Sequence, residues 1–133
     1  MDITKHSILI IDRRRLSLDA TASAVAANPS FNVAGKLTNA ALAEGFLADN
    51  GNIDLILSDT RILNFIAPIK KAYPQIKIVV SGRTPDAASA KFAEAAGANT
   101  FIYKSVSPDN LRYFIAITLL GYNSFPQREA IAP

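Results

Sequence analysis

The sequence predicts an α/β domain in which one parallel, doubly wound sheet of five strands carries helices on both faces. Two observations predict this class. Short, bounded runs rich in β-branched residues, typical of buried strands, recur along the chain. Longer stretches of helical composition alternate with them. Five βα units in succession, joined by right-handed crossovers, build a sheet of this kind.

The five strands are predicted over residues 7–12, 31–37, 53–58, 76–81 and 100–103. Each run is apolar or weakly alternating and lies between turn-forming or polar residues. The second strand alternates least clearly.

The five helices are predicted over residues 16–27, 40–49, 65–73, 86–97 and 108–120. Local chemistry marks their ends. Thr38 or Asn39 can cap the second helix, and Ser107 can cap the last one, with Pro108 at its first helical position. Pro68 is tolerable only in or near the first turn of the third helix.

Length and composition indicate one packed domain. The chain has 133 residues, of which half are hydrophobic and 19% are charged, the balance of a globular protein. We expect the domain to span residues 1–121 and residues 122–133, with two prolines and little periodicity, to be a linker or tail.

Several functional classes are excluded by residue counts. The chain has no cysteine, and its single histidine, His6, cannot anchor a metal cluster or a Ser-His-Asp triad. No apolar run reaches the ~20 residues of a membrane span, and the first residues lack the core of a signal peptide. We therefore expect a cytoplasmic protein without a membrane partner. The net charge of +3 is scattered and indicates solvated surface rather than a nucleic-acid site.

Four of the predicted strands end on different polar residues. These residues are Asp12, Asp59, Ser81 and Lys104. Ligands of an open parallel sheet bind outside the carboxyl ends of its strands. We therefore expect the four side chains to converge at one edge, where a carboxylate could accept a phosphoryl group.

Four segments around these residues resemble the receiver domain of two-component response regulators. They are residues 8–12 (ILIID), 54–59 (DLILSD), 79–82 (VVSG) and 97–104 (GANTFIYK), the last followed by Pro108. Each motif is weak alone, but their order and spacing match over residues 7–121. The resemblance implies a flavodoxin-like sheet of strand order 2-1-3-4-5.

The resemblance also implies roles at the site. Asp59 would be the phosphoacceptor. Asp12, Asp59 and the main-chain carbonyl of Arg61 would hold Mg²⁺, a cation that prefers hard oxygen ligands. Lys104 would pair with the phosphoryl oxygens, and Ser81 would donate a hydrogen bond to them.

A second set of implied roles concerns switching. Ser81 and Phe101 fall where the family has its switch residues, Phe101 at the place of a rotating aromatic ring. Phe101 lacks a hydroxyl group, so any rotation would be transmitted by packing alone.

Arg13 departs from the family pattern, which has a second acidic metal ligand directly after the first. A guanidinium cannot bind Mg²⁺. Its side chain would either pair with Asp59 in the space of the cation or swing into solvent, and the sequence leaves both arrangements open. In either case we expect Mg²⁺ binding to be weak or absent.

The loop after Asp59 is a second departure, because residues 60–64 are several residues short of the family pattern. Loop residues here normally help to shape the metal site. Arg61 and Arg83 lie two residues beyond Asp59 and Ser81, respectively. Their side chains would either shield an acyl phosphate from water or simply lie on the surface.

Two functional interpretations follow. The first is a receiver domain, not an enzyme, that accepts a phosphoryl group on Asp59 in a phosphorelay and switches a partner or output domain. The alternative is a pseudo-receiver, a docking module that is independent of phosphorylation and has its site locked by Arg13. A hydrolase with an aspartate nucleophile requires a second Asp at position 61, where this chain has Arg61. A dinucleotide site requires a glycine motif after residue 12, where the chain has three arginines. Both classes are therefore disfavoured.

The resemblance implies a histidine kinase or phosphotransfer protein as partner. The last predicted helix has a core face formed by Leu111, Phe114, Ile115, Thr118 and Leu119, and further apolar residues on other sides. A helix with apolar residues on more than one side is compatible with a homodimer formed through this helix. DNA would be a partner only through an output domain outside these residues.

Overall fold

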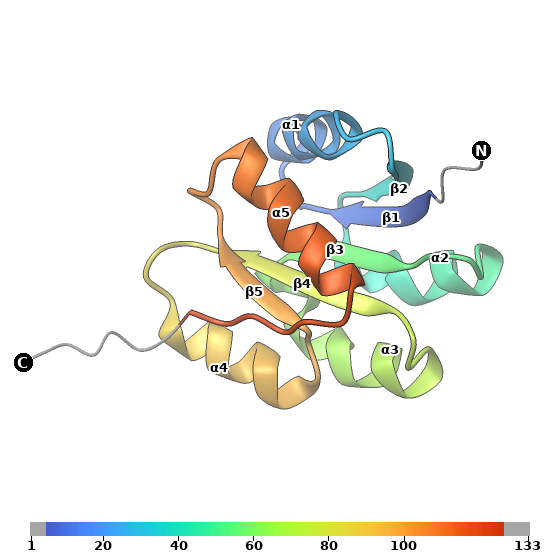
Figure 1. The fold of residues 1–133 in the computed structure, drawn as a ribbon. Helices are drawn as coiled ribbons and strands as arrows, with labels where there is room; N and C mark the ends of the chain where they lie inside the picture. Colours follow the sequence, from blue (N-terminus) through green and yellow to red (C-terminus); the bar gives the residue numbers. More distant parts are fainter. Residues whose placement is uncertain (1–4, 127–133) are drawn as a thin grey trace, which may run out of the picture.

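The computed structural model describes residues 5–126 and contains one parallel sheet. Its strands are β1 (His6–Ile11), β2 (Phe31–Leu37), β3 (Leu55–Asp59), β4 (Lys77–Gly82) and β5 (Thr100–Tyr103). They lie side by side in the order β2-β1-β3-β4-β5, all parallel (Figure 1). The predicted fold class and strand order are therefore confirmed.

The helices are α1 (Arg15–Ala26), α2 (Ala43–Asp49), α3 (Ile66–Ala72), α4 (Ala87–Ala96) and α5 (Pro108–Leu119). Two short 3-10 helices, η1 (Ala40–Leu42) and η2 (Thr60–Phe65), lead into α2 and α3. Helices α1 and α5 cover one face of the sheet, and α2, α3 and α4 cover the other (Figure 1).

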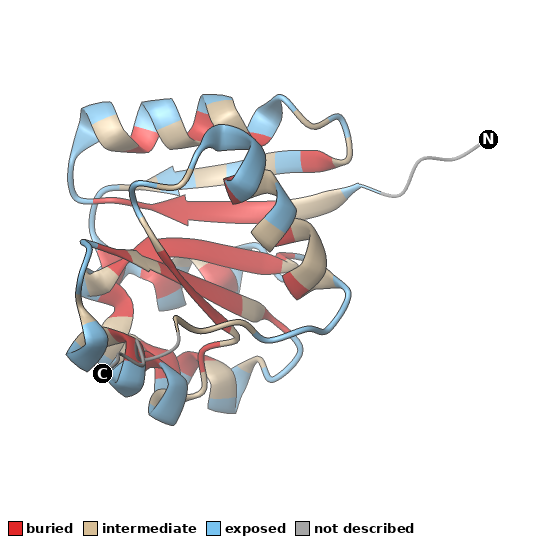
Figure 2. Ribbon diagram, turned by 60° about the vertical axis from the view of Figure 1, so that its left-hand side comes forward, coloured by how far each residue is buried: buried red, intermediate tan, exposed pale blue. Residues whose placement is uncertain are grey.

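The two faces of the sheet carry separate apolar layers, because successive strand residues point to opposite sides. Ile8 and Ile10 of β1 pack with α1 and α5, whereas Leu9 and Ile11 pack on the opposite side. All five residues of the central strand β3 are buried (Figure 2). Apolar β-branched runs suit strands covered on both faces.

The capping residues of the helices are largely those that the sequence predicts. The Asn39 side chain accepts a hydrogen bond from the Ala41 N–H, and the Ser107 hydroxyl accepts one from the Asn110 N–H. Pro108 is the first residue of α5, and Pro68 lies in the first turn of α3. These caps set where each helix starts and so how each loop leaves the carboxyl edge of the sheet.

The segment after Asp59 is more regular than the sequence suggests. Residues 60–64, predicted as a loop before a helix at 65, form η2 directly after β3. The Asp59 carboxylate accepts a hydrogen bond from the Arg61 N–H and thereby caps this 3-10 helix. The residues of η2 are the whole connection between β3 and α3, so the chain turns directly after Asp59.

Residues 122–126, in the segment interpreted as a linker or tail, lie against β5 (Figure 1). The rest of that segment, from residue 127 onward, lies outside the described residues. In the part of the chain that is described, no helix has both the length and the apolar character needed to cross a membrane.

Candidate functional site

Asp12 lies directly after β1 and is 4% exposed. Its Oδ1 accepts a hydrogen bond from the main-chain N–H of Arg14 at 2.9 Å. Its Oδ2 accepts one from the Ser17 hydroxyl and another from Nζ of Lys104 at 3.0 Å. The carboxylate thus exchanges solvent for three donors, which come from the first turn of α1 and from the end of β5.

The charge of Asp12 is stabilised despite its burial. Burial acts to raise the pKa of the carboxyl group, but the hydrogen bonds from Ser17, Arg14 and Lys104, together with the positive charge of Lys104, outweigh it. The pKa of Asp12 therefore lies below its ordinary value. At neutral pH the site holds an ionised carboxylate and its ammonium partner.

Asp59 ends the central strand and is 6% exposed. Its Oδ2 accepts a hydrogen bond from the main-chain N–H of Arg13 at 3.0 Å, and its Oδ1 accepts one from the N–H of Arg61 at 3.1 Å. The carboxylate therefore connects the β1–α1 loop to η2. Among residues 5–126, no lysine or arginine side chain forms an ion pair with it.

Arg13 contacts Asp59 through its main chain only. The residue is exposed, and within the described range its guanidinium takes part in no ion pair or hydrogen bond. Of the two arrangements that the sequence leaves open, the structure has the one in which the side chain points to solvent. Position 13 therefore contributes a main-chain donor to Asp59 and no side chain to the site.

Lys104 forms its ion pair with Asp12 and not with Asp59. Ser81 lies opposite Asp59 in the β3–β4 register. Ser81, Asp12 and Lys104 line one cavity of about 200 Å³ between the sheet, α1 and α5. The structure therefore brings the four strand-end residues to one edge, with Asp12 and Lys104 in direct contact.

Phe101 packs on the opposite side of the sheet from this cavity. It is 2% exposed and belongs to the apolar layer under α2, α3 and α4. Its ring lies so close to Gly82 that a Cβ atom there would be 2.7 Å from the ring Cζ. Its neighbour Tyr103 meets it edge to face, with ring centroids 6.0 Å apart.

The residues present do not fit an ordinary Mg²⁺ site in this arrangement. Within residues 5–126 no three His, Cys, Asp or Glu side chains gather closely enough to hold a metal ion. The four carboxylate oxygens of Asp12 and Asp59 each accept at least one hydrogen bond from the chain. Oδ2 of Asp12 accepts two of these bonds, so a cation that binds this oxygen would have to displace the Ser17 hydroxyl or the Lys104 ammonium.

Arg61 and Arg83 are both exposed at this edge of the sheet. Arg61 contributes its N–H to Asp59, while its predicted role, that of a carbonyl ligand, depends on a cation that this donor set does not favour.

Ser17 is a site residue that sequence reasoning missed. Its hydroxyl donates to Asp12 from the first turn of α1. The available signal was its position, because a hydroxyl residue in the first turn of the helix that follows a strand-end carboxylate lies within reach of it. A hydroxyl group here neutralises nothing, but it helps to keep Asp12 ionised.

Comparison by fold gives receiver domains throughout the most similar structures, whereas comparison by sequence gives nothing. No protein-family model and no curated protein matches the chain. The signal receiver domain of the response regulator NarL from Mycobacterium tuberculosis superposes with a TM-score of 0.82, at 18% identity, over 89% of this chain and 98% of that one.

Two further structures agree. A LuxR family DNA-binding response regulator from Silicibacter pomeroyi has a TM-score of 0.80 and 24% identity, over 92% of this chain and 98% of that one. A CheY-like receiver domain protein from Methanospirillum hungatei has a TM-score of 0.76 and 22% identity, over 87% and 94%. Identities this low establish architecture rather than chemistry. This chain has the fold of a response-regulator receiver domain.

Proposed function

We propose that this chain is the receiver of a two-component pathway, in which Asp59 accepts a phosphoryl group and thereby switches a partner or output domain. The observation that carries the proposal is the position of Asp59. Its carboxylate ends the central strand β3, which lies between β1, followed by Asp12, and β4, which carries Ser81. Lys104, which follows β5 at the same edge, pairs with Asp12. A histidine kinase or a phosphotransfer protein would be the corresponding donor, and the chain would meet it in the cytoplasm.

The transfer step follows from this arrangement. An oxygen of Asp59 attacks phosphorus, the bond from phosphorus to the donor's imidazole nitrogen breaks, and the imidazole leaves with the electron pair. The acyl phosphate adds negative charge beside Asp12. Lys104, whose Nζ is 3.0 Å from the Asp12 carboxylate, would supply a compensating positive charge, and the Ser81 hydroxyl would donate a hydrogen bond from the neighbouring strand. The chain would act as acceptor and switch rather than as an enzyme.

Phosphorylation by phosphoramidate, followed by intact mass, tests the proposal. We expect one phosphoryl group on the wild type and none on Asp59→Asn. Asp54→Asn is the matched control, because Asp54 lies next to the other end of β3, where its carboxylate accepts the Ser7 N–H. It should be modified like the wild type. Modification that survives Asp59→Asn would show that the acceptor is another residue.

A second candidate function is docking that does not depend on phosphorylation. It is favoured by the replacement of an acid by Arg13 and by the hydrogen bonds that already occupy both carboxylates. In this case phosphoramidate leaves the mass unchanged under conditions that modify an ordinary receiver, and Asp59→Asn binds its partner as the wild type does. The same mass measurement, with and without Mg²⁺, therefore separates the two functions.

A further inference from the structure

The face of helix α1 that lines the cavity of about 200 Å³ between α1, α5 and the sheet carries only small side chains. They are those of Ser17, Ala20, Thr21 and Ala24. Their spacing of i, i+3, i+4 and i+7 puts all four on one side of the helix. Because none of them is larger than threonine, the two helices enclose space here instead of filling it.

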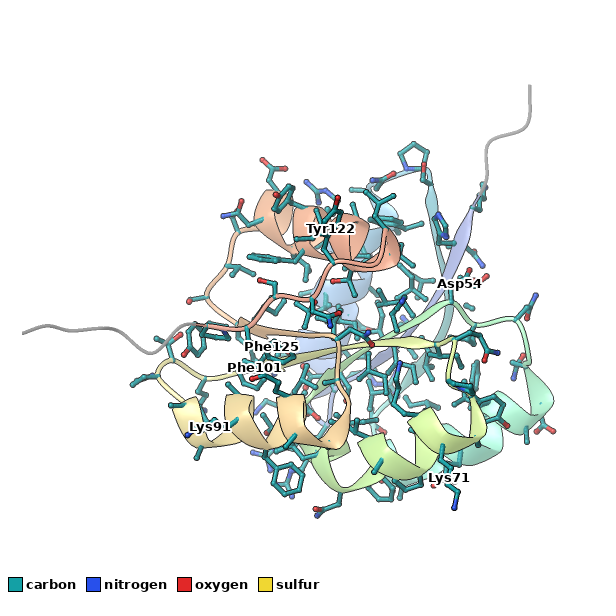
Figure 3. The ribbon with its side chains drawn as sticks, turned by 60° about the horizontal axis from the view of Figure 1, so that its bottom comes forward. Asp54, Lys71, Lys91, Phe101, Tyr122 and Phe125 are labelled. Atoms are coloured by element: carbon teal, nitrogen blue, oxygen red, sulfur yellow. The ribbon has the colours of Figure 1, made fainter. Side chains whose placement is uncertain are left out.

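The body of the cavity is apolar. Leu57 of β3, Ile102 of β5 and Leu111 of α5 line it, and all three are buried. The large ring of Phe101 does not fill it, because this side chain lies on the other face of the sheet, on the side of α4 (Figure 3). An apolar cavity of about 150 Å³ holds a benzene molecule. The cavity between α1 and α5 therefore has room for one ring or for a branched chain of similar size.

The cavity can be entered from solvent between the two helices. Ala20 of α1 and Pro108 of α5 both line it and are exposed. Farther along α1 the helices are tied together, since the Arg112 guanidinium of α5 donates to the Ala24 carbonyl at 2.8 Å. The walls are thus in place before a ligand enters, as is usual for small-molecule sites.

The polar lining of the cavity offers a hydrogen-bond donor. Ser81 and Lys104 line it beside Asp12. An ammonium group has three N–H donors, and among the described residues that of Lys104 uses one of them, toward Asp12 at 3.0 Å. An oxygen atom of a ligand can therefore accept a hydrogen bond from Lys104 without breaking the ion pair.

The charges around the cavity favour an uncharged ligand. The positive charge of Lys104 is already paired with Asp12, and Asp59 adds a second buried carboxylate at the same edge of the sheet. No arginine among the described residues lines the cavity. An anion would therefore meet surplus negative charge, whereas a carbonyl or hydroxyl oxygen accepts the same hydrogen bond without that repulsion.

We propose that this cavity binds a small uncharged molecule that has an apolar body the size of one ring and one carbonyl or hydroxyl oxygen, which accepts a hydrogen bond from Lys104. Apolar walls with a few placed polar groups are typical of such sites. Binding of this kind goes beyond phosphoryl transfer, since the chain would respond directly to a small molecule, and it needs no reaction at Asp59.

Titration with benzamide, followed by amide NMR spectra of the protein, tests the site. Benzamide has one ring and one carbonyl oxygen. We expect a dissociation constant in the millimolar range, which is ordinary for a molecule of so few atoms, and shifts concentrated at Thr21, Val106 and Leu111. Benzoate, which has the same size and a negative charge, should bind several-fold more weakly. Shifts that do not saturate, shifts centred outside the cavity, or tighter binding of benzoate would each overturn the proposal.

Two substitutions test the position of the ligand. Thr21→Leu places a larger apolar side chain in the cavity and should weaken benzamide binding by roughly tenfold or more. Ala95→Leu is the matched control, because Ala95 is exposed on α4, and it should bind like the wild type. Lys104→Met removes the donor, keeps a side chain of similar length and should weaken binding several-fold. Wild-type affinity in either Thr21→Leu or Lys104→Met would contradict this site.

A bound ligand should also slow phosphorylation, and this consequence alone rests on the proposed function. Lys104 would be engaged by the ligand when an acyl phosphate on Asp59 needs its charge. We expect saturating benzamide to slow modification by phosphoramidate several-fold in the wild type and not in Thr21→Leu, as measured by intact mass. Equal rates with benzamide bound would refute the coupling while the site stands. A wild type that is never modified would refute the proposed function, and the titration would still decide the site.

Discussion

At the level of single residues, the charge of Asp12 is held by three donors instead of by water. Ser17, the Arg14 N–H and Lys104 supply them. The neighbouring carboxylate of Asp59 depends on main-chain donors only. The two acids therefore have different partners. Asp12 forms an ion pair with Lys104, whereas Asp59 forms no ion pair with a side chain among the described residues.

The stability of the protein should depend on the ionisation of Asp12. Its pKa is lowered on folding, so its ionised form contributes stability above the unfolded value of 3.8, and this contribution is lost as the pH falls through the lower folded value. Urea unfolding from about pH 6 to about pH 3 should therefore show a steeper loss for the wild type than for Asp12→Asn. Lys104→Met, which removes one donor, should lie between them. Parallel curves for wild type and Asp12→Asn would contradict this account.

Adding a carboxylate at position 13 should raise the Mg²⁺ affinity more than removing the positive charge of Arg13 does. Unit charges ~4 Å apart interact by ~4 kcal/mol at an effective dielectric of about 20, but the exposed Arg13 guanidinium is screened far more than that. We expect Arg13→Asp to tighten Mg²⁺ binding by about tenfold or more and Arg13→Ala by much less, because only the first adds an oxygen ligand. Calorimetric titration of the three proteins decides it. Equal affinity of Arg13→Asp and wild type would mean that position 13 does not reach the metal.

At the level of elements, the carboxyl edge depends on where each helix begins. Helix α5 starts at Pro108 under the Ser107 cap, four residues after Lys104. A frayed start would lengthen the loop that positions Lys104. On the other face, Asp86 caps α4 through the Ser89 N–H, and Gly97 ends it with a φ of 109°, a left-handed conformation that favours glycine.

The Ser107 cap should therefore have a measurable weight. Ser107→Ala removes the acceptor for the Asn110 N–H and should lower the free energy of unfolding by about 1 kcal/mol. Ser105→Ala, in the same exposed loop, is the matched control: it removes only a long, exposed contact of 3.5 Å with the Thr84 hydroxyl and should change the free energy of unfolding by less than ~0.5 kcal/mol. Urea denaturation measures both. Equal effects of the two substitutions would show that the cap contributes nothing.

At the level of the whole molecule, two apolar layers flank one sheet, and the surface of α5 carries further apolar residues. Leu111, Ile115 and Thr118 are buried, and Phe114 and Leu119 pack against them, as the spacing predicts. Tyr113, Ile117 and Leu120 lie at i, i+4 and i+7 and so share another face of the helix. Tyr113 is 58% exposed and Leu120 is 76% exposed.

This second face is where we expect a homodimer to form. Tyr113→Glu should weaken self-association by about tenfold or more, because it places a charge in an apolar contact. Sedimentation equilibrium over a range of concentrations measures this. Leu16→Glu is the matched control, since Leu16 is 87% exposed at the start of α1. A wild type that stays monomeric, or an equal effect of both substitutions, would contradict dimerisation through α5.

The sequence by itself determined the elements, their alternation along the chain and the edge at which the polar strand ends meet, whereas the strand order came from the resemblance to receiver domains. These follow from signals that lie close together in the chain: the apolar run from Leu55 to Ser58 before Asp59, the cap at Ser107 and the alternation of strand and helix. Burial of each run on both faces then requires a parallel sheet covered by helices on both sides. Local chemistry was therefore sufficient for the fold class.

Tertiary structure alone decided which atoms meet at the site and what covers the last strand. Position 13 carries an Arg in the sequence, but only the folded chain shows that its N–H binds Asp59 while its side chain points to solvent. The sequence places two carboxylates, those of Asp12 and Asp59, at the same edge of the sheet as Lys104, and only the structure shows that Lys104 pairs with Asp12. The return of residues 122–126 onto β5 has no local signal, because it depends on an unpaired strand edge and an aromatic pocket formed by distant segments. These contacts join residues that lie far apart in the sequence. Packing and the competition between hydrogen-bond donors decide them, and the periodicity of apolar residues along the chain carries no information about either.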